Sequence, residues 1–131
     1  MASRDASIDI LFGDGEHRFR LLIGELRELE EKRDAGSPLI LRRLLSGEWW
    51  VDDVREVIRL GLVGGGMPAT DALKLVKRYV DDRPAWYENA LIASTALGAA
   101  IMVVEDEEPG KSPAGAAKAP SPSRAKKPTS D

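Results

Sequence analysis

The longest uncharged stretch of the chain runs from Asn89 to Val104 and limits what the chain can fold into. Its sixteen residues form a helical pattern that is apolar on every side, with Leu91 and Ile101 on one stripe, Leu97 on a second and Ile92 on a third. A membrane span needs about 20 apolar residues, and serine, threonine and glycine interrupt this stretch. The pattern therefore predicts a helix that either its neighbours or another protein must cover. The sequence leaves both alternatives open.

Length and charge restrict the functions that the chain can have. The 131 residues suffice for one domain and a tail. Residues 1–108 carry 14 Lys and Arg against 21 Asp and Glu, a net charge of −7, whereas residues 109–131 carry 5 against 1, a net charge of +4. An acidic body argues against nucleic acid as a partner. The absence of cysteine excludes disulfides and thiolate chemistry. No signal peptide or membrane segment is recognisable, so we expect a cytoplasmic protein.

The pattern of the chain predicts a mainly α fold with a small β part, in which an N-terminal β-hairpin packs on a bundle of about five helices. We expect a flexible N-terminus over residues 1–7 and a single helical domain with the hairpin over residues 8–108. Residues 109–131 contain five of the eight prolines and no large apolar side chain. This composition predicts a disordered Pro/Ala/Lys tail.

Residues 8–21 alternate apolar and polar side chains around an Asp14-Gly15 dipeptide, which favours a tight hairpin turn. A two-residue loop at this dipeptide pairs Ile10 with Phe19 on one face and Asp9 with Arg20 on the other. This register separates apolar from charged side chains, whereas a three-residue loop mixes them. We therefore predict the first register.

Five helices are expected after the hairpin, at about residues 22–34, 37–45, 54–63, 68–80 and 84–104. The central one has the clearest start and end. Asp53 is the predicted N-cap, and Glu56 falls at the reciprocal position of a capping box. The run Gly64-Gly65-Gly66 ends this helix, because glycine favours departure from helical backbone.

No residue set in the chain has the pattern of a catalytic, cofactor or metal site. The glycines from Gly61 to Gly66 lack the Gly-Lys-Ser/Thr ending of a phosphate-binding loop and follow no strand. His17 is the only histidine, so a histidine triad or a histidine metal site has no second member. The sequence predicts a non-enzymatic protein without a cofactor.

A helix-turn-helix protein also has two helices joined by a short glycine-containing turn, as the helices around Gly64–Met67 would be. The basic residues Lys74, Lys77 and Arg78 fall late in the second of these helices. Base contacts come mainly from the early part of a recognition helix. A DNA-binding regulator is therefore the third hypothesis, and an ordinary helical hairpin is preferred.

Three segments carry a family resemblance: F-G-D-G-E-x-R-F-R-L-x-I-G-E-L-R-E-L-E from Phe12, W-x-V-D-D-V-R-E-x-I-R-L-G-L-x-G-G-G-M from Trp49, and L-x-L-V-x-x-Y-V-D-x-R-P from Leu73. Together they resemble the tail assembly protein family of gene transfer agents and related tailed-phage prophages. The resemblance spans Ile8 to about Val104. It implies a role in tail morphogenesis in a bacterial cell, with the assembled particle as a second location, and the family is labelled both tail tube protein and tail assembly chaperone.

Strand content decides which label we prefer. Tail-tube subunits line a continuous β channel with several strands each, whereas this chain offers one hairpin. We therefore expect a tail assembly chaperone that binds tail tube or tape-measure protein through apolar helix surface. Self-association is a further expectation, and a structural tail tube component is the alternative. The expected partner-binding residues are the aromatic and apolar anchors Trp49, Trp50, Trp86, Tyr87, Leu91 and Ile101.

Overall fold

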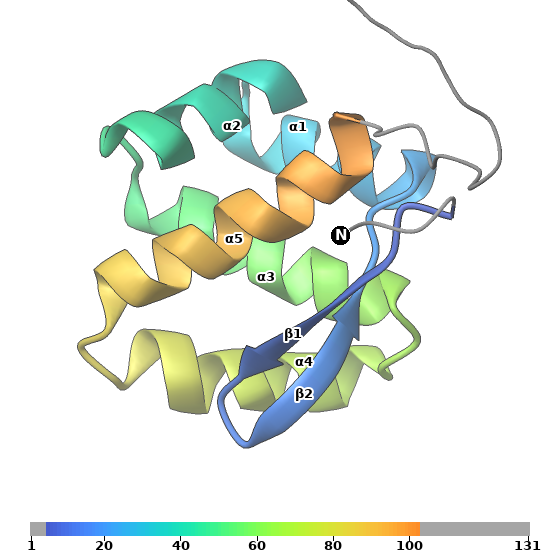
Figure 1. The fold of residues 1–131 in the computed structure, drawn as a ribbon, viewed down its shortest axis with the longest axis vertical. Helices are drawn as coiled ribbons and strands as arrows, with labels where there is room; N and C mark the ends of the chain where they lie inside the picture. The colour runs from blue at the N-terminus through green and yellow to red at the C-terminus, as the bar shows by residue number, and fades with distance from the viewer. Residues whose placement is uncertain (1–4, 103–131) are drawn as a thin grey trace, which may run out of the picture.

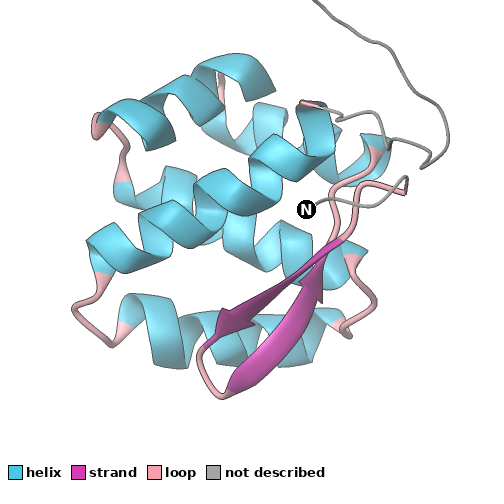
Figure 2. Ribbon diagram, viewed as in Figure 1, coloured by secondary structure: helices cyan, strands magenta, loops and turns pink. Residues whose placement is uncertain are grey.

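The computed structural model describes residues 5–102. A two-stranded antiparallel sheet is followed by helices (Figures 1 and 2). The elements are β1 (Ile8–Phe12), β2 (Gly15–Phe19), α1 (Ile23–Arg33), α2 (Ser37–Ser46), α3 (Val51–Gly64), α4 (Ala69–Val76), the π-helix η1 (Lys77–Asp81) and α5 (Trp86–Ile101). The predicted hairpin on a bundle of about five helices is confirmed. The expectations for residues 1–4 and for the tail fall outside the described residues, but Asp5 already accepts hydrogen bonds from the backbone and hydroxyl of Ser7.

Helix α3 lies at the centre of the fold. Its apolar stripe includes Val54, Val57 and Ile58, none of which is exposed. It contacts α1, α2, α4, α5 and β2. In Figure 1, α5 lies across α3, with α1 and α2 on one side and α4 on the other. The hydrophobic core therefore surrounds α3, as the predicted amphipathic pattern requires.

The hairpin register differs from the predicted one by two residues. Ile10 lies opposite His17 rather than Phe19, and Asp9 lies opposite Arg18 rather than Arg20. The loop consists of Gly13 and Asp14, and Gly13 has a φ of +64°. The ring of Tyr79 is only 2.6 Å from where a Cβ of Gly13 would lie, so a larger residue would collide with it. A two-residue shift leaves the two faces of the hairpin unchanged, because side chains alternate with a period of two.

Two glycines at the end of α3 let the hairpin backbone approach closely. A Cβ on Gly64 would lie 1.9 Å from the carbonyl oxygen of Arg20, and one on Gly65 would lie 2.0 Å from that of Arg18. The backbone N–H of Arg20 donates to the carbonyl of Gly61 at 3.0 Å. The glycine run therefore has a second role besides ending the helix. Because it has no side chains, the backbone of β2 and of the residues after it can pack directly against the end of α3.

The start of α3 also differs from the prediction. The N-cap is Trp50, and Asp53 lies three residues into the helix, where its Oδ2 accepts the backbone N–H of Trp50 at 2.8 Å. Glu56 takes no part in this cap and instead accepts two hydrogen bonds from Arg59. Contacts with other helices explain the difference, because Asp53 is also the partner of two distant arginines.

The fourth expected helix is divided into α4 and η1. The helical pattern of residues 68–80 predicts an inner face of Ala69, Ala72, Leu73, Val76 and Val80. Ala72, Val76 and Val80 are fully buried, whereas Ala69 and Leu73 are exposed. Buried Asn89 of α5 donates its side-chain N–H to the carbonyl of Tyr79 at 3.0 Å. This bond satisfies a carbonyl within the π-helical turn.

Candidate partner-binding surface

Helices α2 and α5 pack side by side and share an outer surface, which we call the α2–α5 surface. Trp49, directly after α2, contacts Trp86 at the start of α5, and Ile101 at the end of α5 lies beside Pro38 at the start of α2. The two helices are therefore antiparallel. The surface runs from an aromatic cluster to an apolar groove, and its members are Trp49, Trp86, Tyr87, Leu91, Pro38, Leu41, Leu45, Ile101 and Met102.

Neighbouring elements cover most of helix α5. Ala90, Ala93 and Leu97 face the core and are at most 3% exposed. On the opposite side Tyr87 is 79% exposed and Leu91 is 66% exposed. The sequence left open whether neighbouring helices or another protein cover this uncharged helix. In the structure, neighbouring elements cover most of it and leave one apolar stripe in contact with solvent.

An aromatic cluster forms one end of the α2–α5 surface. The rings of Trp49 and Trp86 are stacked, with centroids 6.3 Å apart and an angle of 24° between planes. Tyr87 meets Trp49 edge-on at 5.3 Å and 76°. Trp49 and Trp86 are half-buried and pack against the core, which holds both rings in place. Such amphipathic rings are enriched at protein interfaces.

An apolar groove of about 520 Å³ forms the other end. It is lined by Pro38, Leu41, Arg42, Leu45, Ser46, Ile101 and Met102. Leu45 is 66% exposed, whereas Ile101 is half-buried and packs against the core. The groove thus has a fixed apolar floor and an exposed apolar rim, and Arg42 is the only charged residue among its lining residues between 5 and 102.

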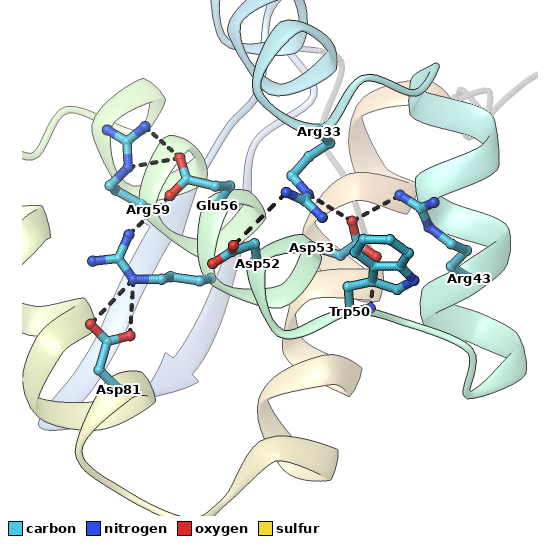
Figure 3. Close-up of polar contacts among 9 residues, drawn as sticks. Arg33, Arg43, Trp50, Asp52, Asp53, Glu56, Arg59 and Asp81 are labelled. Carbon is cyan, nitrogen blue, oxygen red and sulfur yellow. Dashed lines mark hydrogen bonds and ion pairs between the residues drawn. The ribbon is translucent and has the colours of Figure 1, made fainter.

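Trp50 faces a different environment from Trp49, as expected for adjacent residues. It is 64% exposed, and the guanidinium groups of Arg33 and Arg43 lie 5.9 and 5.7 Å from its ring centroid. Both arginines donate to Oδ1 of the fully buried Asp53, each at 2.9 Å (Figure 3). This ion cluster joins α1, α2 and α3.

A second ion cluster continues along α3. Glu56 is held by Arg55 and Arg59, and Arg55 also reaches Asp81 beyond α4 (Figure 3). The hydrogen bond to Asp81 raises the pKa of the Arg55 guanidinium. Every acidic group in these two clusters lies within 4.0 Å of an arginine, so their arrangement serves to join helices.

Five of the six predicted partner-binding residues lie on one surface. Trp49, Trp86 and Tyr87 contact each other, and Leu91 and Ile101 follow along α5. Trp50 lies apart, over the arginine pair. The sequence analysis missed the α2 side of the surface, with Leu41 and Leu45, and also Met102 of the groove. A signal was present, because five of the ten residues of α2 are leucine or isoleucine, more than one buried stripe needs.

Comparison with protein families assigns the chain to one family. A family model described as phage tail tube protein, GTA-gp10, matches residues 5–102, which is most of the chain. The chain belongs to this family. The expected relationship to gene transfer agent and phage tail proteins is thereby confirmed. A search of curated proteins and a search of solved structures each gave no match.

As a member of the phage tail tube protein family, the chain is a phage-like tail component. The matched residues include the hairpin, all helices and the α2–α5 surface. Within residues 5–102, no helix is long and apolar enough to cross a membrane.

Proposed function

We propose that the chain is a non-enzymatic tail assembly chaperone, which binds a tail tube or tape-measure protein through the α2–α5 surface and leaves when the tail is assembled. The observation that carries the proposal is the stripe of exposed apolar side chains at Tyr87, Leu91 and Leu45, next to an open apolar groove. Contiguous apolar surface on a small protein marks a site of interaction.

Strand content supports a chaperone rather than a wall subunit of the tube. Within residues 5–102 the sheet has two strands, each of five residues. A subunit that lines a continuous β channel needs more strand surface than one such hairpin. The helices, in contrast, present the kind of surface into which an amphipathic helix of a partner can dock, with apolar anchors at helical spacing.

The energetics suit temporary binding. Full burial of an exposed leucine or methionine side chain contributes about 1.5–3 kcal/mol. Leu45, Leu91 and Met102 together can therefore contribute at most roughly 9 kcal/mol, before the cost of association is subtracted. Association itself costs at least about 4 kcal/mol, so these three side chains alone leave at most roughly 5 kcal/mol, which is weaker than the roughly 8 kcal/mol of micromolar binding. Such a surface holds a partner reversibly, as a protein that leaves the assembly must.

The test replaces exposed anchors rather than core residues. The double variant Leu45→Ser/Leu91→Ser should lose co-purification with the tail tube and tape-measure proteins, because both side chains are mostly exposed. Its helical circular dichroism should stay unchanged. Leu73→Ser on α4 is the matched control, since Leu73 is 47% exposed and lies outside the α2–α5 surface. Ile101 is unsuitable because it packs against the core. Unchanged co-purification of the double variant would disprove the proposal.

A structural component of the tail tube is the second candidate, and the description of the family favours it. Mass spectrometry of purified particles separates the two functions. A chaperone should be absent or far below the copy number of the tube subunit, whereas a structural component should be present at a fixed ratio to it.

A further inference from the structure

The outer edge of β1 carries backbone groups that no other described residue binds. Phe12 and Gly15 form the hydrogen-bonded pair that closes the two-residue turn, and bonded and non-bonded pairs alternate along the hairpin from there. Asp9 and Leu11 belong to the non-bonded pairs, so their N–H and C=O groups point away from β2. Across this edge they make no hydrogen bond with any residue between 5 and 102. The described chain therefore leaves two donors and two acceptors unpaired there.

The edge of β2, in contrast, lies against α3. The backbone N–H of Arg20, directly after β2, donates to the carbonyl of Gly61 at 3.0 Å. On the β1 side, the side chain of Asp9 is 59% exposed and Leu11 is 74% exposed. An open edge with an exposed apolar side chain is a template for pairing with a further strand. Within residues 5–102, the hairpin is thus closed on one edge only.

A pocket of about 130 Å³ lies beside this edge, between the hairpin turn and the start of α5. Asn89 lines it and is 4% exposed. Its Nδ2 donates to the carbonyl of Tyr79, whereas its Oδ1 accepts no hydrogen bond from any residue between 5 and 102. The lining residue Glu88 forms no ion pair in the same range, and the guanidinium carbon of Arg83 lies 5.8 Å from the ring centroid of Tyr79. The pocket thus offers oxygen acceptors to a side chain that donates a hydrogen bond.

We propose that an extended segment of the bound tail protein adds to β1 as a third strand, with a basic residue opposite Asp9 and an apolar residue opposite Leu11. Strand addition satisfies the unpaired donors and acceptors of both residues, because an extended backbone carries the same alternation. The two partner residues are two positions apart and lie on one face of the enlarged sheet. A donor side chain further along the segment can enter the pocket. The inference rests on the proposed function, which supplies the partner.

A second copy of the chain is a poorer occupant of this edge. A two-fold axis through Ile10 would place Asp9 of each copy opposite an uncharged leucine, with the two Asp9 carboxylates diagonal neighbours at about 7–8 Å. Two bodies of net charge −7 also repel each other. Five-residue strands alone bury much less than the roughly 1,200 Å² of a stable interface. A partner on the α2–α5 surface adds the area of that surface, because α5 contacts both α2 and β1.

Amide hydrogen exchange measured by NMR tests the pairing directly. In the free protein, the Asp9 and Leu11 amides should exchange freely, whereas the Ile10 and Phe12 amides, which bond to β2, should be protected. In the purified complex with the tail tube or tape-measure protein, exchange at Asp9 and Leu11 should slow by about tenfold or more. Unchanged exchange in the complex would overturn the inference. Protection in the free protein would also overturn it, and a dependence on protein concentration would assign the edge to a second copy.

A proline variant tests the same edge by affinity. Leu11→Pro removes an N–H that takes no part in the pairing with β2, and proline is tolerated at such edge positions. Affinity for the partner should fall about tenfold or more. Leu11→Val is the matched control, because it keeps both the N–H and an apolar side chain, and its affinity should stay near that of wild type. Equal affinities of the two variants would contradict strand addition. If circular dichroism shows that Leu11→Pro is misfolded, the exchange experiment decides.

A charge reversal tests the stated chemistry of the segment. Asp9→Lys should weaken binding about tenfold, because it places a positive charge opposite the basic residue of the partner. Glu16→Lys is the matched control. It changes the net charge by the same amount, but Glu16 lies on β2 and not beside the added strand. Equal effects of the two variants would overturn the assignment of a basic residue.

The outcomes separate this inference from the proposed function. If Leu45→Ser/Leu91→Ser abolishes co-purification while Leu11→Pro leaves affinity unchanged, the proposed function stands and the strand addition is wrong. If only Leu11→Pro abolishes binding, the partner is held at the β1 edge and the α2–α5 surface is not its site. If neither tail protein binds the wild-type chain, both proposals are wrong.

Discussion

Asp53 is the residue on which three helices depend. Its fully buried carboxylate accepts hydrogen bonds from Arg33, Arg43 and the backbone of Trp50. Asp53→Asn leaves two partly buried arginines without their countercharge, which typically costs about 3–5 kcal/mol. We expect a loss of that size in the free energy of unfolding measured with urea. Asp52→Asn is the control, because Asp52 is largely exposed and 4.0 Å from Arg33, and it should cost less than about 1 kcal/mol.

Glu30 predicts a pH dependence of stability. The backbone N–H and the hydroxyl of Ser37 both donate to its Oε2 at 2.8 Å, and these bonds lower the pKa of the Glu30 carboxyl from its usual value of 4.5. The contribution is therefore present above pH 4.5 and is lost as pH falls through the lowered pKa. Glu30→Gln should destabilise the protein at pH 7, and the difference from wild type in urea unfolding should shrink below pH 4. A difference that is constant with pH would contradict the assignment.

Residue roles were harder to predict than residue burial. The sequence correctly predicted that a carboxylate caps the start of α3. It placed Asp53 at the N-cap and Glu56 at the reciprocal position of a capping box, whereas the N-cap is Trp50 and Asp53 itself occupies the reciprocal position. The observed role of Asp53 depends on Arg33 and Arg43, which lie 20 and 10 residues away in the sequence. Local capping rules contain no information about such partners. In the same way, no local pattern indicated that Trp49 would stack on Trp86.

At the scale of elements, the junction of α3 with the hairpin gives a paired prediction. Gly64→Ala and Gly65→Ala should each destabilise the fold, because the added Cβ would lie about 2 Å from a β2 backbone oxygen or its continuation. Gly98→Ala, in the interior of α5, meets no atom within 4 Å. It should stabilise the protein by about 1 kcal/mol through helix propensity alone. Thermal unfolding of the three variants tests the opposite signs, and a loss of stability in Gly98→Ala would contradict the open space at that position.

The type of each element and the side that it buries were predictable where a single periodic pattern of apolar residues determines them. The faces of the hairpin and all the amphipathic helices follow from periods of 2 and 3.6 residues. The hairpin register did not follow, because the contact of Gly13 with Tyr79 selects the turn from a distance of 66 positions along the chain. The π-helical turn η1 also has no local signal, and its carbonyl is satisfied by Asn89 of the next helix.

At the scale of the molecule, α3 contacts one strand and the four other α-helices, so the parts have little independent stability. We expect the hairpin and the bundle to unfold together. Amide hydrogen exchange should give the same opening free energy for Phe19 in β2 and for Val57 in α3, because both are fully buried in one core. A much lower value for Phe19 would show that the hairpin opens by itself.

All three tryptophans of the chain occur between residues 49 and 86, and two of them form the stacked pair at the aromatic end of the α2–α5 surface. Two indoles at this separation couple their electronic transitions, so the pair should give a distinct signal in circular dichroism. Intrinsic tryptophan emission comes from this pair and from Trp50, which lies apart over Arg33 and Arg43. A binding event at the surface is therefore observable by optical spectroscopy in the unlabelled, unmodified protein.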